Sequence, residues 1–409
     1  MHALLRTWIA LALLTPASPE VKWVANLGGR IYSSVVVADL NRDGLVEILD
    51  CDSEDRQLVC LDSGGKELWR YGGTQVFSIR LTSTPAVGDL DRDGEAEIYL
   101  AGGDGQLVRL DEGGAEVWRL QPPGNVDWCC PALLTRPEPL VLIGTNDRWL
   151  VAVGPEGEIA WQRQLRGGMG GPMAIVDVDG DGSEEIVCSG GGGGNYCFDY
   201  GGELRWRHPS MTATDSGPAA GCLREGEPVT LVCVEGEGTL AALDAATARV
   251  RWRYRTVAHN NPIDATLALA DLNGDGALEI LFCDITGYVY ALTAGGAEYW
   301  VSKMENGAYA APAVGDVDGD GRPEVLVGSN DGYLYCFDAE GNLKWRFAAL
   351  PLIGTSPAIA DIDGDGETEI LVGSHNNRVH CLTLHGRYDP FLVPWPCWRA
   401  NSANTGWVR

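Results

Sequence analysis

Positive charge is scarce in this sequence. The 30 Lys and Arg residues are outnumbered by 57 Asp and Glu residues, which leaves a formal net charge of −27 at pH 7. Phosphate backbones and anionic lipid headgroups repel such a chain, so nucleic acid and acidic membrane surfaces are not expected partners. Many of the carboxylates fall in short loops with a regular spacing, which predicts that part of this negative charge serves to bind cations.

Long apolar runs are absent after the N-terminus, so no later segment is predicted to cross a bilayer as a helix. The N-terminus itself reads MHALLRTWIALALLTPAS. Arg6 precedes the apolar run Trp8–Leu14, and the small residues Thr15 and Ala17 suit a cleavage site. This arrangement is typical of a secretory signal. We therefore expect residues 1–18 to be a signal peptide and the mature protein to be secreted, periplasmic or held at the cell surface.

Helical periodicity is also missing, and short apolar runs separated by Gly, Asp and Asn turns take its place. The clearest unit is Ala311–Phe347, APAVGDVDGDGRPEVLVGSNDGYLYCFDAEGNLKWRF, with four such runs. Its Asp-rich loop recurs from Asp39, Asp89, Asp177, Asp271, Asp316 and Asp361, and its last Trp recurs at Trp69, Trp118, Trp161, Trp206, Trp252, Trp300 and Trp345. The units that end at Trp161 and Trp252 keep the strands without the loop. Eight four-stranded repeats predict an all-β, eight-bladed β-propeller.

The two ends of the repeat array predict how the ring closes. Trp23 stands 16 residues before Asp39, as Trp345 stands 16 residues before Asp361, so residues 20–27 resemble the last strand of a blade. The eighth blade lacks a Trp strand of its own, and we expect residues 20–27 to complete it and cover its edge. The propeller would then span residues 19–393. The tail 394–409, PWPCWRANSANTGWVR, carries three Trp residues and is expected to pack on the propeller.

The twelve cysteines are an even number, but their positions do not predict a disulfide framework. Cys60, Cys197, Cys336 and Cys381 fall at or near the same strand position of four repeats. Small buried residues that fill a packing site are the simpler interpretation. The adjacent pair Cys129 and Cys130 stays outside this pattern, and its role is open.

The Asp-rich loop has the donor pattern of a Ca²⁺ site. Oxygen side chains occupy positions 1, 3 and 5, Gly at position 6 permits a tight turn, and position 7 offers a carbonyl and position 9 a carboxylate. Hard oxygen donors without His or Cys favour Ca²⁺ over zinc or copper. The sequence therefore predicts up to six structural Ca²⁺ ions. The predicted ligands, loop by loop, are Asp39, Asn41, Asp43 and Glu47; Asp89, Asp91, Asp93 and Glu97; Asp177, Asp179, Asp181 and Glu185; Asp271, Asn273, Asp275 and Glu279; Asp316, Asp318, Asp320 and Glu324; and Asp361, Asp363, Asp365 and Glu369.

These units resemble two known propeller families. PAVGDLDRDGEAEIYLAG, PAVGDVDGDGRPEVLVGS and PAIADIDGDGETEILVGS resemble the FG-GAP/VCBS-type repeats of bacterial surface proteins and integrin α-chains. That resemblance implies a propeller with Ca²⁺ between the first two strands of a blade, although position 9 is Glu where integrins usually have Asp. GYLYCFDAEGNLKWRF and GTLAALDAATARVRWR resemble the blades of pyrroloquinoline-quinone (PQQ) propellers.

Three functions fit this description. The first is a non-catalytic scaffold that binds carbohydrate or protein, as in cell adhesion, and works as a monomer. The second is a secreted polysaccharide lyase or another carbohydrate-active enzyme, because some lyases are similar to this chain in their Ca²⁺-loop propellers. The third is a PQQ-dependent dehydrogenase, for which the adjacent cysteines of Trp128-Cys129-Cys130-Pro131 offer a partial match.

The links from the fourth strand of one blade to the first strand of the next differ most among repeats. Variable loops on a rigid scaffold are where binding usually resides, so we expect a ligand at the mouth that these links surround. The Ca²⁺ loops would lie on the other face. The candidate ligand-binding residues are Arg80, Asp127, Trp128, Asp215, His259, Asn260, Asn261, Asp264, Asn306 and Tyr309.

Overall fold

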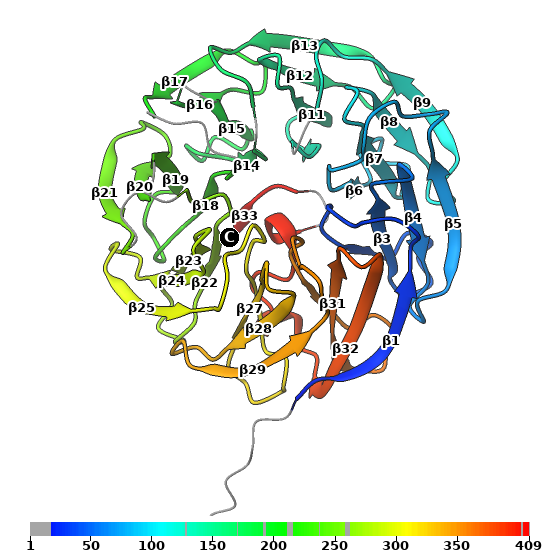
Figure 1. Cartoon of the computed structure of the whole chain (residues 1–409). Coiled ribbons are helices and arrows are strands. Elements are labelled where there is room, and N and C mark those ends of the chain that lie inside the picture. Colours follow the sequence, from blue (N-terminus) through cyan, green and yellow to red (C-terminus); the bar gives the residue numbers. More distant parts are fainter. Residues whose placement is uncertain are drawn as a thin grey trace, which may run out of the picture.

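Eight antiparallel sheets surround one central axis, which confirms the predicted eight-bladed β-propeller (Figure 1). The computed structural model describes residues 18–126, 129–169, 171–190, 194–210, 216–236, 238–257, 262–401 and 404–408. Within these ranges the chain forms β-strands and two short 3-10 helices, η1 (Pro390–Leu392) and η2 (Trp398–Ala400). None of the helices in the described parts is long and apolar enough to cross a membrane.

Each blade runs outward from a short inner strand, and we number the blades along the chain. The strands of blades 1 to 4 are β2 (Val36–Ala38), β3 (Glu47–Asp52), β4 (Gln57–Leu61) and β5 (Glu67–Gly72); β6 (Ala86–Gly88), β7 (Glu97–Ala101), β8 (Leu107–Leu110) and β9 (Glu116–Leu120); β10 (Ala132–Leu134), β11 (Leu140–Gly144), β12 (Trp149–Val153) and β13 (Ile159–Gln164); and β14 (Ala174–Val176), β15 (Glu185–Gly190), β16 (Gly194–Phe198) and β17 (Leu204–His208).

Blades 5 to 8 follow the same plan, with two additions from the chain ends. Their strands are β18 (Ala219–Gly221), β19 (Thr230–Gly236), β20 (Thr239–Asp244) and β21 (Val250–Arg255); β22 (Ala268–Ala270), β23 (Glu279–Cys283), β24 (Tyr288–Leu292) and β25 (Glu298–Lys303); β26 (Ala313–Gly315), β27 (Glu324–Gly328), β28 (Tyr333–Phe337) and β29 (Leu343–Ala348); and β30 (Ala358–Ala360), β31 (Glu367–Ser374) and β32 (Arg378–Arg387). The additions are β1 (Glu20–Asn26), which pairs with β32, and β33 (Trp407–Val408), which pairs with β18.

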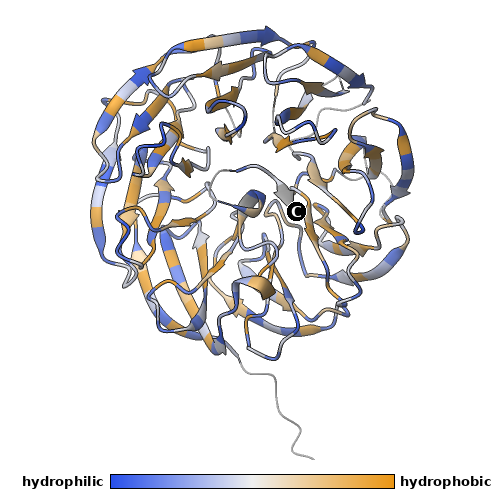
Figure 2. Ribbon diagram, turned by 180° about the vertical axis from the view of Figure 1, so that it is seen from behind, coloured by the Kyte–Doolittle hydropathy of each residue, from blue (hydrophilic) through white to orange (hydrophobic). Residues whose placement is uncertain are grey.

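The core lies between neighbouring blades and involves mainly the three inner strands. All six residues of β3 are buried, whereas the residues of the outer strand β5 are exposed or half-buried. Figure 2 shows the same division, with mostly apolar inner strands and an outer strand of each blade that mixes polar and apolar residues. The twelve cysteines are free thiols, and only Cys222 is not fully buried.

Closure of the ring by the N-terminal strand is confirmed. β1 pairs antiparallel with β32, in a register that runs from Glu20 opposite Thr383 to Asn26 opposite Arg378. It becomes the outermost strand of blade 8, next to β32, so that the two ends of the chain meet in this blade (Figure 1). The sheet edge that β32 would otherwise expose is thereby paired.

The Trp that ends a repeat packs on the outer turn of the next blade. Trp300 Nε1 donates a hydrogen bond to the Ala339 carbonyl at 3.0 Å. Its ring lies against Gly341, which has a φ of 82°, and a Cβ built there would be 2.5 Å from the ring. This position therefore needs Gly for its backbone conformation and for the close approach of the ring. Trp23, Trp69, Trp118, Trp161 and Trp252 lie in the same way against Gly65, Gly114, Gly157, Gly202 and Gly296.

Trp345 is an exception that provides a matched comparison. The fourth strand of blade 8 is β1, so no turn joins it to β32, and the buried Nε1 of Trp345 has no hydrogen-bond partner in the described part of the chain. We expect Trp300→Phe to cost about 1–2 kcal/mol more than Trp345→Phe, because only the first change leaves a carbonyl without its donor. Urea unfolding of both variants tests this, and equal shifts of the midpoint would contradict it.

The C-terminal tail enters the central channel and hydrogen-bonds to the inner strands around it (Figure 1). Trp395 exchanges backbone hydrogen bonds with Val314 of blade 7, and the Pro396 carbonyl accepts from Ile359 N of blade 8. The Thr405 and Gly406 carbonyls accept from blades 4 and 5 at 2.9 and 3.1 Å.

Two tail side chains complete these contacts. The Arg399 guanidinium is fully buried and donates to the carbonyls of Met173 and Pro218, and burial lowers its pKa to about 9. Asn404 Nδ2 donates to the Pro85 and Pro131 carbonyls, both at 3.1 Å. The tail thus connects blades 2, 3, 4, 5, 7 and 8 from inside the ring.

Candidate functional site

The six Asp-rich loops all lie on one face of the propeller. Each loop connects the first strand of a blade to the second, as residues 39–47 connect β2 to β3. Because successive strands are antiparallel, these loops share a face with the turns between the third and fourth strands. The second-to-third-strand turns and the links between blades lie on the opposite face, at the mouth.

The loops share one backbone-capping arrangement, which blade 7 illustrates. Gly321 N, at position 6, donates to Asp316 Oδ2 at 2.8 Å. Arg322 N donates to Asp320 Oδ1 at 2.9 Å, and Val317 N donates to Glu324 Oε2 at 3.0 Å. Glu at position 9 is buried and makes the same bond to position 2 in all six loops, through Glu47, Glu97, Glu185, Glu279, Glu324 and Glu369.

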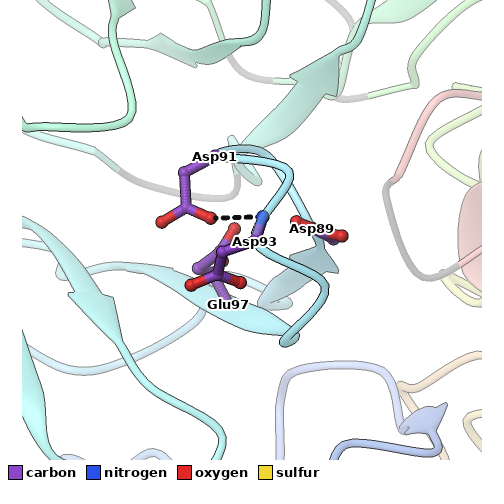
Figure 3. Close-up of side chains that lie close together, drawn as sticks. All are labelled: Asp89, Asp91, Asp93 and Glu97. Carbon is purple, nitrogen blue, oxygen red and sulfur yellow. Dashed lines mark hydrogen bonds between the residues drawn. The ribbon is translucent and has the colours of Figure 1, made fainter.

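Four loops bring their carboxylates close enough to hold one metal ion. In blades 2, 4, 7 and 8, carboxylate oxygens of three or four acidic residues lie within 4.8 Å of one another. Figure 3 shows this cluster in blade 2, where Asp91, Asp93 and Glu97 lie close together. Burial raises the pKa of Glu97, Glu185 and Glu324 to about 7, because loss of contact with water disfavours the charged form of a carboxyl group. The all-oxygen donor sets fit a hard cation.

The mouth holds a cavity of about 350 Å³. Its lining comes from the links into blades 1, 2, 3, 6, 7 and 8 and from one turn of blade 8, and comprises Tyr32, Ser34, Thr82, Thr84, Cys130, Asp264, Tyr309, Leu352, Gly354 and His375. The tail lies close to this cavity, since Asn404 Nδ2 donates to the carbonyl of Thr84 at 3.4 Å. The volume falls in the range of small-molecule sites.

The cavity combines a carboxylate, hydroxyls and aromatic rings. Asp264 is half-buried, and burial raises its pKa. The described residues offer it no hydrogen bond or ion pair, so its oxygens are available to a ligand. The ring of His375 packs on Tyr32 at 4.4 Å, and its pKa is lowered by burial and by Arg30. Tyr309 also lines the cavity, and 52% of its surface is accessible.

A series of hydrogen bonds between neighbouring blades shapes the rim of this cavity. Ser356 N donates to Ser34 Oγ at 3.1 Å, and Ser34 N donates to Thr84 Oγ1 at 3.0 Å. Thr84 N donates to Cys130 Sγ at 3.2 Å, so the thiol accepts a hydrogen bond as the hydroxyls of Ser34 and Thr84 do in blades 1 and 2. The adjacent cysteines therefore have a structural explanation: Cys130 belongs to this series, and Cys129 is buried in the core beside it.

The predicted ligand residues divide into three groups. Asp264 and Tyr309 line the cavity. Arg80 and Asn306 are exposed and do not line it. The remaining candidates, Asp127, Trp128, Asp215, His259, Asn260 and Asn261, lie outside the described residues.

Other residues of the lining were not predicted from the sequence. Tyr32 and Ser34 lie in the link from the closing strand to blade 1, and His375 lies in a hairpin turn of blade 8. The sequence-based prediction named candidate residues only in the links that follow blades 1, 2, 4, 5 and 6, so it missed the link after β1 and the turn between β31 and β32. The hydroxyl residues that precede the first strands, such as Ser34 and Thr84, were an available signal.

Comparisons with known proteins agree with this architecture. A model of the FG-GAP-like repeat matches residues 271–327 and 316–372, and a model of the lambda-carrageenase beta-propeller domain matches residues 140–216. No curated protein sequence matches the chain.

Several solved structures share the fold. The V. cholerae biofilm matrix protein Bap1 is 14% identical, with a TM-score of 0.65 over 92% of this chain and 92% of that chain. The exotype rhamnogalacturonan lyase YesX is 18% identical, with a TM-score of 0.64 over 94% and 80%. The quinohemoprotein alcohol dehydrogenase from Comamonas testosteroni is 12% identical, with a TM-score of 0.64 over 91% and 77%. At these identities the likeness is one of fold, and the chain is an eight-bladed β-propeller that contains FG-GAP-like repeats.

Proposed function

We propose that this protein is an exported, monomeric binding propeller that holds a neutral carbohydrate in the cavity at its mouth without catalysing a reaction. The observation that carries this proposal is the Asp264 carboxylate, which has no partner among the described residues, in a cavity with aromatic rings and hydroxyls. A carboxylate accepts hydrogen bonds from sugar hydroxyls, and rings such as Tyr32 and Tyr309 pack on the apolar faces of sugars. A protein ligand, as in adhesion, would use the same mouth through a side chain of similar chemistry.

The catalytic alternative fits the described lining less well. A glycoside hydrolase usually needs two carboxyl groups that flank the scissile bond, and Asp264 is the only carboxylate among the described lining residues. A lyase that acts on an acidic sugar needs a cation near the sugar carboxylate, and the described part of the lining contains neither Lys nor Arg. A quinone cofactor is also not needed to explain Cys129 and Cys130, because Cys130 has its own place in the rim.

Ca²⁺ is the ion that we propose for the acidic loops, in a structural role. Their donors are oxygens, which suits a hard cation, and they lie on the face opposite the cavity, away from a bound ligand. An ion bound only by the folded state would stabilise the propeller by linkage. The number of loops that take up an ion depends on whether a Lys or Arg side chain already lies against the carboxylates of the loop.

Saccharide binding by matched variants tests the proposed function. The wild-type protein, Asp264→Asn and Asn306→Ala would be titrated with neutral disaccharides such as cellobiose, mannobiose and lactose, with saturation-transfer NMR and calorimetry as readouts. We expect Asp264→Asn to weaken binding by about 10- to 100-fold, because a charged acceptor is lost. Asn306→Ala is the control, since Asn306 is exposed outside the cavity. Binding to none of the sugars, or release of products from an oligosaccharide, would overturn the proposal.

A further inference from the structure

Lysine is rare in this chain, and two of its four lysines end inside an acidic loop. Lys22 and Lys344 each precede the Trp of an outer strand. Lys22 Nζ lies 2.7 Å from Asp363 Oδ2 and 2.9 Å from Glu369 Oε1 in the loop of blade 8. Lys344 Nζ lies 2.5 Å from Asp318 Oδ2 and 2.8 Å from Glu324 Oε1 in the loop of blade 7. Each ammonium thus lies between the carboxylates of positions 3 and 9.

Two arginines reach the equivalent place in blades 4 and 2. Arg205, which also precedes a Trp, lies 2.6 Å from Asp179 and 2.8 Å from Glu185. Arg109 lies 2.5 Å from Asp91 and 3.3 Å from Glu97, but it comes from the third strand of its blade. Since a different strand supplies the cation in blade 2, the shared feature is the place of the charge and not a repeated sequence position.

The two other loops lack such a cation among the described contacts, and both have Asn at position 3. In blade 1, Asn41 Nδ2 donates to Glu47 Oε1 at 3.0 Å and to Asp43 Oδ2 at 3.1 Å, so the position 3 amide itself contacts the position 9 Glu that a cation contacts elsewhere. Blade 6 has Asn273 at this position. Four carboxylates and one cation give −4 + 1 = −3, and three carboxylates with Asn also give −3. The residues at positions 1, 3, 5 and 9, taken together with the side-chain cation where there is one, therefore carry the same formal charge in all six loops.

This correspondence has a direct physical cause. The position 9 Glu is buried in every loop, and an Asp at position 3 brings a second negative charge against it. Two ionised carboxylates this close together repel each other unless a cation lies between them. The place between them is also where a metal ion would bind. A Lys or Arg at that place removes the repulsion, and so does an Asn in place of the Asp.

We propose that Lys22, Arg109, Arg205 and Lys344 are built-in counterions that occupy the place of a divalent cation in the loops of blades 8, 2, 4 and 7. These four loops are then stable without Ca²⁺ and exclude it until the side chain is displaced. The inference goes beyond saccharide binding, because it concerns the opposite face. It also reduces the number of metal ions below the six that the Asp spacing alone predicts.

Removal of one side-chain cation tests the proposal. Lys344→Met would be compared with wild type, with Lys344→Met/Asp318→Asn and with the control Lys66→Met, since Lys66 is exposed on a turn of blade 1. Thermal midpoints in EGTA and in millimolar CaCl₂, and bound Ca²⁺ by equilibrium dialysis, are the readouts. We expect Lys344→Met to lower the midpoint in EGTA by about 3–6 °C, because the buried Glu324 and the half-buried Asp318 lose the cation between them. Ca²⁺ should restore the midpoint, with one more ion bound about tenfold or more tightly than in wild type.

The double variant and the wild type show whether the lost charge of Lys344 is the cause of the expected changes. Lys344→Met/Asp318→Asn recreates the combination found in blades 1 and 6, so its midpoint in EGTA should return toward the wild-type value. The proposal fails if Ca²⁺ does not rescue Lys344→Met, if this variant binds no additional ion, or if wild type already binds six. Arg205→Met repeats the test should Lys344→Met not fold. Saccharide binding should be unchanged in all of these variants, so the proposed function is tested separately.

Discussion

A chain that ends at Val393 is expected not to reach a stable folded state. The missing tail carries Trp395 and Arg399, both completely buried, and its backbone accepts hydrogen bonds from inner strands of blades 4, 5, 7 and 8. Loss of a buried Trp costs about 3–5 kcal/mol, and each buried backbone group left without a partner costs about 1–3 kcal/mol. The sum is comparable to the roughly 5–15 kcal/mol by which domains are usually stable, so little or no stability would remain.

Point variants in the same tail show whether packing in the channel is the cause. Trp395→Ala should lower the free energy of unfolding by about 3–5 kcal/mol, because the large cavity that it leaves is surrounded by core residues of blades 6 and 7. Phe391→Ala is the control, since Phe391 is 91% exposed on η1, and it should change stability by less than about 0.5 kcal/mol. Circular dichroism and size-exclusion chromatography would follow folding. A truncated protein that melts cooperatively at the wild-type midpoint would contradict the expectation.

The sequence was sufficient to predict the propeller because each blade repeats the same local pattern. Alternating apolar runs, Gly turns and the Trp of the outer strand each report on contacts within one blade or with the next blade. The spacing from Trp23 to Asp39 equals the spacing from Trp345 to Asp361 within the repeats, so it identified the N-terminal segment as the last strand of a blade. The pairing of β1 with β32 could be predicted for this reason. The acidic loops were visible for the same reason, since their residues lie within nine positions of one another.

Features that depend on one unique contact were not predictable in this way. Nothing in the repeats indicates that Asn404 reaches the Pro85 and Pro131 carbonyls, because the tail occurs once and crosses the channel. The counterions have a weak sequence signal, a Lys or Arg before a Trp, and Arg109 departs even from that. The mouth cavity draws residues from blades far apart in sequence, so its lining, from Tyr32 to His375, required coordinates.

The second large effect is expected from deletion of Glu20–Asn26, because the closing strand makes three kinds of contact. It pairs with β32 along its length, and Trp23 Nε1 donates to the Ser63 carbonyl of blade 1 at 2.9 Å. Lys22 also enters the acidic loop of blade 8. Without the strand, the edge of β32 is exposed and offers unpaired backbone groups to other chains. We therefore expect the deleted protein to aggregate, or to associate through this edge, and to lose its cooperative thermal transition.

A peptide added in trans separates loss of the strand from a general failure to fold. The synthetic segment Glu20–Asn26 should restore a monomer with a cooperative melt, because it can add to the open edge as a strand. The same peptide with Trp23→Ala should rescue poorly, since about 3–5 kcal/mol of packing on blade 1 is lost with the ring. Rescue by both peptides alike would show that strand pairing alone closes the ring. A deleted protein that stays monomeric with an unchanged midpoint would show that the ring does not need β1, and the tail in the channel would then be the element that holds blades 7 and 8 to the rest.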